Sequence, residues 1–496
     1  MRREARRVMA LVGVAALFMS LVFSLGAGNG QAAGNPDRFL ALLRSQGFQC
    51  NQGAVSFLDL FALGCACQVP SCWGNNPSSR YGAYILPPAP GQTALNSWCE
   101  TFSSATEPNW SVFWRLRPDE AVVFIGQTPP RMTYFGFLSY LFDRAGTPPV
   151  NTPCPRPPSV DNRAQEVFAS LHDTLNPLTI KTSGSTRDPF SKATIIVTTA
   201  DRGIAFAVRS ALLRAGYPSS IINFDVVPSA MLNLGVDQSA DTLQFTIRLS
   251  PLDQDSQAVQ DYMANPGTVW RVTPETVTPP ERLDPIPVPK LRVRGTGQTE
   301  LDLLPAVEEL RQAIIDRYSG NYDYIEIPSV DFMEGYVAIQ SGQNALGDNR
   351  DTVFMINGPF TSPAVPYLLE PDEFIVVYGV NHAAMGKATY SNFAVTGGVL
   401  NVGAGSVRSE EFPGSAEDYL PSDANTAKLY AWTIKRLNQC GDDPHCLEIG
   451  YECLGGGIPV DQKLRVAFRA YLERATKVGP TYPELVHDRT IKFTPK

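Results

Sequence analysis

The chain has 496 residues, which corresponds to two to four domains at roughly 150 residues per domain. Hydrophobic residues make up 44% and charged residues 18%, so the composition allows a sizeable core and excludes wholesale disorder. The formal net charge is −8, and neither nucleic acid nor an anionic membrane is therefore expected as the main partner.

The first residues have the pattern of an export signal. Arginines are concentrated within residues 2–7, an apolar run follows from Val8 to Leu25, and Gly30-Gln31-Ala32 has the small-x-small form of a cleavage site. We therefore predict a signal peptide at residues 1–32 and a secreted or periplasmic protein with no other membrane association. The alternative is an uncleaved anchor, because the apolar run is just long enough to span a bilayer.

Cysteine usage fits an exported protein. In an oxidising compartment clustered cysteines form disulfides by default, and zinc is disfavoured because no histidine lies near Cys65-Ala66-Cys67. Since the total of nine is odd, at least one thiol is expected to be free or to pair with another molecule. The cysteines are Cys50, Cys65, Cys67, Cys72, Cys99, Cys154, Cys440, Cys446 and Cys453.

Residues 33–118 carry Cys, Ser and Pro and show only short helical patterns, such as Pro36 to Gln46. We predict that they form an N-terminal extension held together by disulfides. Regular structure begins near Glu120, where a short apolar run precedes an aromatic run at 132–142. Both runs predict strands, and they open a first α+β domain at residues 119–273.

The segment 193–227 has a βαβ pattern. β-branched residues at 193–199 predict a strand, Asp201 is placed to cap the helix that follows, and a glycine then ends that helix. The second strand is predicted at 221–227. A further strand is predicted at 242–249, where apolar and polar residues alternate.

A proline-rich stretch at 274–290 predicts a semi-rigid linker. Beyond it we predict a second α+β domain at 291–400 and a C-terminal segment at 401–496 that contains a helix and the last cysteines. The second domain is expected to begin with a helix that includes Leu303 to Ile314. Its strands are predicted at 324–327, 335–339, 352–356, 373–378 and 388–397.

Two stretches of the chain share one pattern. Glu120–Gly126 is an acidic residue, an apolar strand and a glycine, and Tyr134–Phe137 follows as Tyr-x-x-Phe. Glu373–Gly379 has the same composition and is followed by Tyr390–Phe393. The pattern predicts an internal duplication, and the alternative is two ordinary hairpins. The predicted fold class is α+β, with two antiparallel-sheet halves, helices packed on one face, and disulfide-bearing ends.

The stretch Tyr378–Tyr390 gathers polar groups in a glycine-punctuated loop between two strands. We predict that His382 is a general acid or base, that Tyr390 is a second proton donor, and that Lys387 and Asn381 bind the substrate. The alternative is a plain hairpin in which the histidine bonds a backbone carbonyl and the lysine is solvated.

Two carboxylates lie just before the strand predicted at 352–356. Asp348 or Asp351 is expected within about 3 Å of His382, where it would fix one tautomer of the imidazole. No cofactor is predicted, although the same oxygens suit a divalent cation such as Ca²⁺. The alternative is an Asx turn before the strand.

Arg294 lies in a glycine-containing stretch at 292–297 that opens the helix after the linker. Backbone N–H groups at a helix start can bind an anion, so Arg294 is a second candidate anion anchor beside Lys387. The alternative is the end of a linker with Thr299 as the helix cap.

Several chemistries are excluded by missing motifs. The chain has no Gly-x-Ser-x-Gly elbow, no P-loop, no dinucleotide fingerprint and no HExxH motif. With four histidines in the whole chain, a multi-histidine metal centre is nearly unavailable.

Two functions remain. The first is an enzyme that acts by acid–base chemistry on a small anionic or oxygenated organic substrate, with the His382 loop as its centre. The second is a non-catalytic ligand-binding or surface protein, in which the aromatic stretch Tyr134–Phe142 lines a groove and Tyr134 contacts the ligand. Both hypotheses imply a small-molecule partner.

Overall fold

All residues described by the computed structural model belong to one compact unit within Ala32–Lys496. The described ranges are 34–58, 75–92, 110–145, 164–184, 188–332, 334–358, 367–397, 402–452 and 457–496. The predicted signal peptide lies outside them. The cysteines outside them are Cys65, Cys67, Cys72, Cys99, Cys154 and Cys453.

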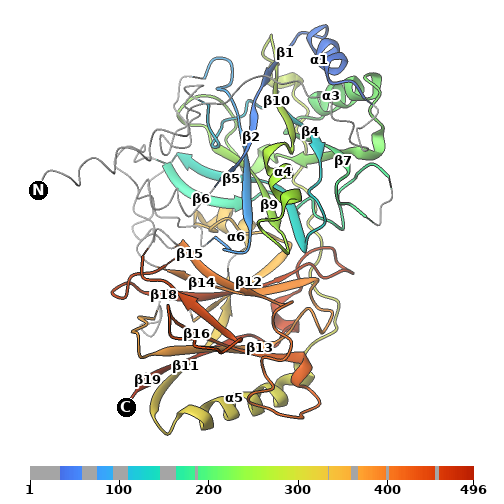
Figure 1. The fold of residues 1–496 in the computed structure, drawn as a ribbon. Coiled ribbons are helices and arrows are strands. Elements are labelled where there is room, and N and C mark those ends of the chain that lie inside the picture. The colour runs from blue at the N-terminus through green and yellow to red at the C-terminus, as the bar shows by residue number, and fades with distance from the viewer. Residues whose placement is uncertain are drawn as a thin grey trace, which may run out of the picture. The chain divides into compact units, whose positions relative to one another are not determined.

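The fold is mixed α+β and consists mostly of strands, which confirms the predicted class (Figure 1). The elements up to Pro274 are called the first half. They are α1 (Pro36–Arg44), β1 (Phe48–Gln52), β2 (Ala54–Leu58), β3 (Arg80–Ile85), β4 (Ala121–Gln127), β5 (Tyr134–Ala145), β6 (Ala164–Ser170), β7 (Ala193–Thr199), α3 (Arg202–Arg214), β8 (Ile222–Val226), β9 (Thr242–Ser250), α4 (Gln257–Ala264) and β10 (Gly267–Pro274).

The elements from Leu301 onward are called the second half. They are α5 (Leu304–Tyr318), β11 (Tyr322–Asp331), α6 (Gly335–Ser341), β12 (Thr352–Asn357), β13 (Phe374–Val380), β14 (Tyr390–Gly397), β15 (Val402–Arg408), β16 (Leu429–Arg436), β17 (Cys446–Ile449), β18 (Leu464–Tyr471) and β19 (Arg489–Pro495).

The strands form three sheets. The first half contains the sheets β1-β10-β4-β7-β8 and β2-β3-β9-β5-β6, and the second half contains the sheet β15-β14-β18-β12-β11-β19-β13-β16-β17. Neighbouring strands are antiparallel except for the parallel pairs β7–β8 and β16–β17. The nine-stranded sheet is nearly closed, because its edge strands β15 and β17 lie close together, with Gly405 next to Leu447.

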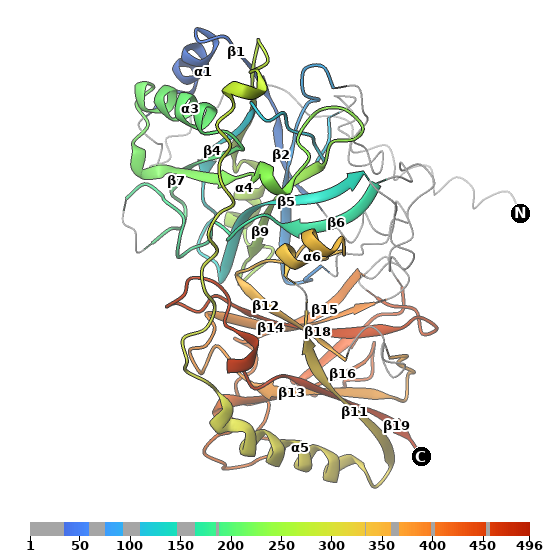
Figure 2. The same ribbon diagram turned by 180° about the vertical axis from the view of Figure 1, so that it is seen from behind.

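Each half has an apolar core between strands and a second one under helices. Phe124 of β4 and Phe245 of β9 belong to the core between the two sheets of the first half. The other face of β4 and β7 is covered by α1 and α3, which lie side by side in Figures 1 and 2. In the second half α5 covers β13 from outside. No helix within the described ranges is long and apolar enough to cross a membrane.

The βαβ unit predicted at 193–227 is confirmed. β7 and β8 are parallel neighbours with α3 between them in the chain, and the Asp201 carboxylate accepts the Ile204 N–H at 2.9 Å as the helix cap. The strand predicted at 335–339 is wrong, because these residues form α6. This short helix ends at Gly342, which adopts the left-handed conformation at φ 67° that favours glycine.

The segments predicted as an N-terminal extension and a C-terminal segment both supply strands of the sheets. The described part of 33–118 supplies β1, which pairs with β10, β3, which pairs with β9, and β2, which pairs with β3. Residues of 401–496 likewise supply β15 to β19. The helix predicted in that segment is wrong for its described residues, since Leu464–Tyr471 is a fully buried central strand.

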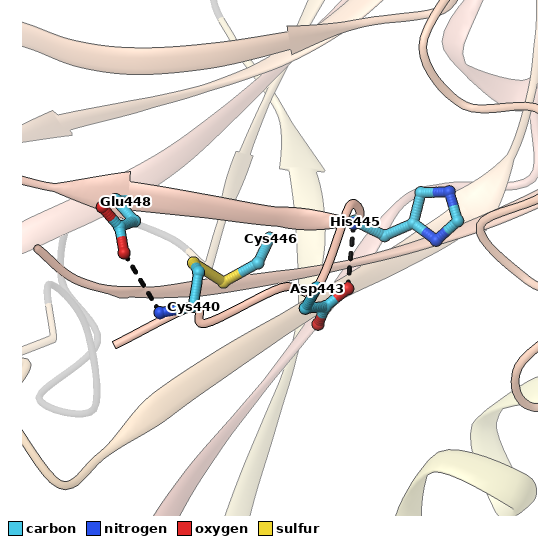
Figure 3. Close-up of a disulfide and its surroundings, with 5 residues drawn as sticks. All are labelled: Cys440, Asp443, His445, Cys446 and Glu448. Atoms are coloured by element: carbon cyan, nitrogen blue, oxygen red, sulfur yellow. Dashed lines mark hydrogen bonds between the residues drawn. A yellow bond between two sulfur atoms is a disulfide. The ribbon is translucent and has the colours of Figure 1, made fainter. Parts of the chain in front are cut away.

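Cys440 and Cys446 form a disulfide, which closes a short loop before β17 (Figure 3). The loop is also held by the Cys440 N–H, which donates to the Glu448 carboxylate at 3.1 Å. Cys50 carries a free thiol. Burial raises the pKa of Cys50 to about 11, against the opposing charge of Arg44, so at neutral pH this group is a thiol rather than a reactive thiolate.

Candidate functional site

His382 is buried in a turn that follows β13. Its Nδ1 lies 2.8 Å from the Glu300 carboxylate, and its Nε2 lies 3.4 Å from that of Asp488. Burial alone would lower the pKa of His382, but these two carboxylates raise it to about 10. The imidazole is therefore protonated at neutral pH and is engaged on both nitrogens, which leaves no free nitrogen to act as a base.

The predicted partners of His382 are wrong. Neither Asp348 nor Asp351 contacts it, because both belong to the turn before β12 and accept hydrogen bonds from other residues. The distant residues Glu300 and Asp488 are its partners instead, at separations of 82 and 106 positions in the chain.

The other polar residues of this turn are held by the protein as well. Lys387 Nζ donates to the carboxylates of Glu473 at 2.5 Å and Glu484 at 2.6 Å, and to the Gln298 carbonyl at 2.8 Å. All three ammonium protons thus have acceptors, and Lys387 is not a free anion anchor. Asn381 accepts the Ala384 N–H at 3.1 Å and shapes the turn.

The carboxylates of Asp348 and Asp351 face donors rather than a cation. Asp348 accepts the backbone N–H groups of Ser170 at 2.7 Å and Gly335 at 2.8 Å. Asp351 accepts the Asn176 amide at 2.7 Å, and its own N–H donates to the Asn349 side chain at 2.9 Å. This is the Asx turn that the sequence offered as the alternative. Within the described ranges no group of three or more His, Cys, Asp or Glu residues is arranged to hold a metal ion.

Tyr134 and Tyr390 lie close to each other, on either side of Tyr471. The ring centres of Tyr134 and Tyr390 are 4.6 and 5.1 Å from that of Tyr471. The Tyr134 hydroxyl donates to Asp351 at 2.9 Å, and the Tyr390 hydroxyl is hydrogen-bonded to Ser78 at 3.2 Å. Both tyrosines therefore join the first half to the second, and a role in proton donation or ligand contact stays a prediction.

Asp351 gives a testable pH dependence. Burial raises its pKa to about 7 from an ordinary 3.8, against the hydrogen bonds from Asn176 and Tyr134. The folded state thus binds this proton more tightly than the unfolded state, so stability should fall as the pH rises from about 4 to 7. Asp351→Asn is expected to flatten that fall, as measured by urea unfolding across this pH range.

The control for this experiment is Asp255→Asn, because the Asp255 side chain is 92% exposed. That variant should keep the slope of the wild-type protein. Equal slopes for Asp351→Asn and the wild type would show that Asp351 is ionised throughout the range.

Arg294 and Asp348 line one cavity of about 190 Å³. The guanidinium of Arg294 is already engaged, because it donates to the Glu334 carboxylate at 2.6 Å and to the Thr352 carbonyl at 3.0 Å. The predicted cap Thr299 makes no cap bond, and Glu300 precedes the first helical turn instead. The ion pairs of Arg292 with Asp173 and of Arg294 with Glu334 hold the stretch at 292–297 to both halves, so the Arg294 guanidinium is not a free anion anchor.

A buried histidine that sequence analysis did not single out lies in the first half. His172 Nε2 is 2.5 Å from the Asp225 carboxylate, and its Nδ1 is 2.7 Å from the Asp173 carbonyl. Burial would lower the pKa of His172, but Asp225 raises it overall. The Ser139 hydroxyl donates to Asp225 and not to the imidazole, so the order of groups differs from that of a catalytic triad.

A second cavity, of about 50 Å³, brings together two arginines and several rings between the halves. Gln244, Thr246 and Arg248 alternate along β9, so their side chains point to the same side of the sheet. Arg469 and Tyr471 alternate in the same way on β18. The lining also includes Leu58, Asn75, Tyr81, Gly82, Ala83, Phe168, Leu346, Gly347 and Phe354.

Two polar side chains of this lining, Gln244 and Thr246, each have an atom without a partner in the protein. Arg248 donates to the Gly347 carbonyl, and the ionisable groups that act on it most strongly are tyrosines. None of the described carboxylates forms an ion pair with it. Gln244 and Thr246 are 6% and 5% exposed, and the Gln244 Oε1 and Thr246 Oγ1 atoms have no hydrogen-bond partner. Buried polar groups normally find partners, so these point to a bound molecule.

The size and charge of the cavity limit what it can hold. A single water needs roughly 10–15 Å³ of such space, so about 50 Å³ corresponds to a group of a few heavy atoms. Two guanidinium groups add positive charge to the lining, and guanidinium N–H groups donate to oxygen acceptors. The alternation of 242–249 was visible in the sequence, but nothing in it indicates which strand of the second half lies opposite.

Comparisons with known proteins do not assign this chain to a family. No protein-family model matches the chain, and no curated protein matches it. A crystal structure of an uncharacterized protein from Burkholderia cenocepacia aligns with 92% of this chain and 86% of its own, at 11% sequence identity and a TM-score of 0.35. At that TM-score the likeness supports no argument about fold or function.

Proposed function

We propose that the chain is an exported, non-catalytic protein that binds a small anionic ligand in the cavity between its halves. The observation that carries this proposal is the lining itself. Arg248 and Arg469 reach the cavity from different halves, and the buried Gln244 and Thr246 side chains have atoms there without a partner. Negatively charged oxygens of a ligand would accept hydrogen bonds from the guanidinium groups and the Thr246 hydroxyl, and a hydroxyl or N–H group of the ligand would donate to the Gln244 Oε1.

The contacts of His382 support binding rather than acid–base catalysis. A general base must have a free nitrogen near its substrate and a pKa near the working pH, whereas His382 is held by Glu300 and Asp488 with its pKa raised to about 10. The aromatic groove expected at Tyr134–Phe142 has no support either, because every side chain of that stretch is buried.

Sulfate is a suitable probe of the proposed site. We expect the wild-type protein to bind it in calorimetric titrations and Arg248→Gln to weaken binding at least tenfold, since hydrogen bonds to charged groups contribute about 1.5–3 kcal/mol each. Arg131→Gln is the matched control, because Arg131 is an exposed arginine paired with Asp188. Absence of binding, or an equal affinity in Arg248→Gln, would refute the proposal.

Export also belongs to this proposal. The disulfide Cys440–Cys446 agrees with an oxidising compartment, which is also what the leader and the cysteine clusters predict. A secreted or periplasmic location fits a binding protein that meets small anions outside the cytoplasm. Mass spectrometry of exported material should show an N-terminus near Ala32.

We also infer that the two halves arose by internal duplication. The order β1-β10-β4-β7-β8 corresponds to β11-β19-β13-β16-β17, and β2-β3-β9-β5-β6 corresponds to β11-β12-β18-β14-β15. The parallel pair β7–β8 thereby matches the parallel pair β16–β17. One long strand, β11, takes the places of β1 and β2, which are separated only by Gly53.

The acidic residue of the repeated sequence pattern supports the duplication. In the first half Glu120 precedes β4, and its carboxylate accepts the Arg117 N–H at 2.8 Å and the Thr273 hydroxyl at 2.5 Å. It also pairs with Arg271 at 2.9 Å. One carboxylate thus joins the start of β4 to two residues of β10.

The second half repeats this arrangement around Glu373. Its carboxylate accepts the Glu370 N–H at 2.8 Å and the Thr494 hydroxyl at 2.9 Å, and it pairs with Lys492 at 2.7 Å. The donors occupy the same positions as in the first half: a backbone N–H three residues earlier, a basic residue and a threonine two positions after it. Two unrelated hairpins of similar composition would have no reason to share such a network.

A further inference from the structure

We propose that the ligand of the cavity between the halves is a small hydroxy carboxylate, whose hydroxyl bonds Gln244 and Thr246 while its carboxylate bonds Arg248. This inference rests on the proposed function and adds the hydroxyl group. Glycolate, the smallest compound of this class, is a group of a few heavy atoms and fits the cavity of about 50 Å³.

The two unpartnered side chains lie on a central strand of their sheet. Thr246 of β9 pairs with Ala83 of β3 on one side and with Leu138 of β5 on the other, and Gln244 pairs with Tyr140 of β5. A central strand offers its side chains no solvent at a sheet edge. Both residues line the cavity, so a bound molecule is the partner that their polar atoms can reach.

The unpartnered atoms require a donor from the ligand. The Gln244 Oε1 can only accept hydrogen bonds, whereas the Thr246 hydroxyl can donate and accept. An anion without a hydrogen-bond donor leaves the Gln244 Oε1 unsatisfied. One hydroxyl group of a ligand satisfies both residues, because it donates to Gln244 and accepts from Thr246.

The charge of the lining favours a neutral donor. None of the described residues that line the cavity is an aspartate or a glutamate, whereas Arg248 brings a positive charge. An ammonium group would therefore meet a guanidinium with no carboxylate in the lining to compensate it, and such like-charge contacts are unfavourable. A hydroxyl group supplies the donor without that repulsion.

Arg248 has donors left for the carboxylate of the ligand. Its guanidinium donates to the Gly347 carbonyl and lies 5.3 Å from the centre of the Tyr140 ring. A guanidinium has five N–H groups, so these contacts do not exhaust it. Along one side of β9 the order is Gln244, Thr246, Arg248, so the atom that needs a donor and the group that binds a carboxylate lie at opposite ends of this row.

The wall that holds Arg248 has an unusual backbone. Phe168 and Leu346 both line the cavity, and both have left-handed backbones, at φ 31° and φ 51°. Bulky residues adopt this conformation only where the surrounding structure imposes it, and such positions cluster at ligand sites. The Gly347 N–H donates to the Phe168 carbonyl at 2.8 Å, which joins the two positions beside the carbonyl that binds Arg248.

Strand registers show which residues of the second half are equivalent to these. Arg248 lies two residues before the β9 partner of Tyr134, and Arg469 lies two residues before the β18 partner of Tyr390. Since Tyr134 and Tyr390 begin the same Tyr-x-x-Phe pattern, the two arginines occupy one position of the proposed duplication.

The fold does not require the polar pair. By the same register Thr246 corresponds to Ala467 and Gln244 corresponds to Arg465. At the first position the equivalent strand therefore carries no polar group. At the second, Arg465 donates to the Asn357 carbonyl at 3.4 Å and so has a partner in the protein. The unpartnered pair is thus a feature of the first half alone, as expected for residues that bind a ligand.

The test is a calorimetric titration of the full chain with glycolate and with propionate, which has the same charge and a methyl group in place of the hydroxyl. We expect the wild-type protein to bind glycolate at least tenfold more tightly, because propionate leaves a buried acceptor unsatisfied. Gln244→Met and Thr246→Val should each reduce that preference to within a few-fold. The matched control is Gln260→Met, which should leave it unchanged, because Gln260 is exposed and bonds the Gln254 carbonyl.

Melting temperatures provide a second measurement. Without ligand, Gln244→Met removes an unsatisfied buried acceptor and should melt no lower than the wild-type protein. Glycolate should raise the melting temperature of the wild-type protein more than that of Gln244→Met. A lower melting temperature of the ligand-free variant would mean that Gln244 has a partner in the protein, and the inference would be overturned.

The titrations separate this inference from the proposed function. Failure of sulfate, glycolate and propionate alike to bind overturns both. Binding of sulfate alone, or equal binding of glycolate and propionate, overturns the hydroxy carboxylate and leaves the anion site. A preference for glycolate that persists in Gln244→Met also overturns the inference, because the hydroxyl then binds elsewhere.

Discussion

Arg271→Met is expected to lower the free energy of unfolding by about 3–5 kcal/mol, because it leaves a carboxylate buried without its cation. Arg271 and Glu120 are 2.9 Å apart, and both side chains have no exposed surface. The guanidinium also donates to the carbonyls of Pro87 at 3.1 Å and Arg115 at 3.0 Å, which would lose their donor. Urea unfolding monitored by circular dichroism measures the loss.

The proposed duplication provides the matched control, Lys492→Met. Lys492 pairs with Glu373 at the corresponding position, but these two side chains are 14% and 8% exposed, so water can partly replace the missing partner. We expect a clearly smaller loss of stability there. Equal losses of stability at both positions would mean that burial of the ion pair does not determine how much stability is lost when its cation is removed.

His382→Gln is expected to remove most of the loss of stability between neutral and alkaline pH. The pKa of His382 is raised from 6.5 to about 10 in the folded protein, so the folded state keeps its proton longer than the unfolded chain. Its contribution is complete below about pH 6.5 and is lost as the pH rises to about 10, at up to about 1.4 kcal/mol per pH unit.

The measurement is the free energy of unfolding from pH 6 to 10 for the wild-type protein and the variant. His487→Gln is the control, because His487 contacts the Tyr482 carbonyl and ring rather than a carboxylate. It should follow the wild-type curve. A His382→Gln curve as steep as that of the wild type would contradict the proposed imidazolium between Glu300 and Asp488.

Local patterns predicted most strands and the βαβ unit, because period-two alternation and β-branched runs depend only on neighbouring residues. The segment 335–339 has the pattern of a strand because Gly-Tyr-Val-Ala-Ile is short and apolar, and such a run fits a strand or a buried helix equally well. The structural feature that marks it as a helix is the left-handed turn at Gly342, where the helix ends. The sequence contains further matches that support the proposed duplication, beyond the strand pattern that ends in Tyr-x-x-Phe. Pro118–Glu120 recurs as Pro371–Glu373, and Arg271-Val-Thr-Pro is matched by Lys492-Phe-Thr-Pro.

The candidate site could not be predicted from local sequence patterns, because its residues come from distant parts of the chain. The sequence around His382 predicts a carboxylate partner, but a loop histidine gives no indication that its partners lie far away in the chain, at Glu300 and Asp488. The cavity depends on β9 and β18 facing each other, which is a property of how the halves assemble. Only the equivalence of Arg248 and Arg469 could have indicated it, and that needs strand registers.

The near closure of the nine-stranded sheet has a consequence for self-association. Unpaired strand edges are the places where a second chain can add by backbone hydrogen bonds. In the second half the two terminal strands β15 and β17 shield each other. In the described part of the first half, the outer backbone groups of β6 are engaged by Ala345, Gly347 and Asp348, whereas β8 pairs with β7 alone. Aggregation through strand edges should therefore start from β8, and charged substitutions on that strand are the ones expected to suppress it.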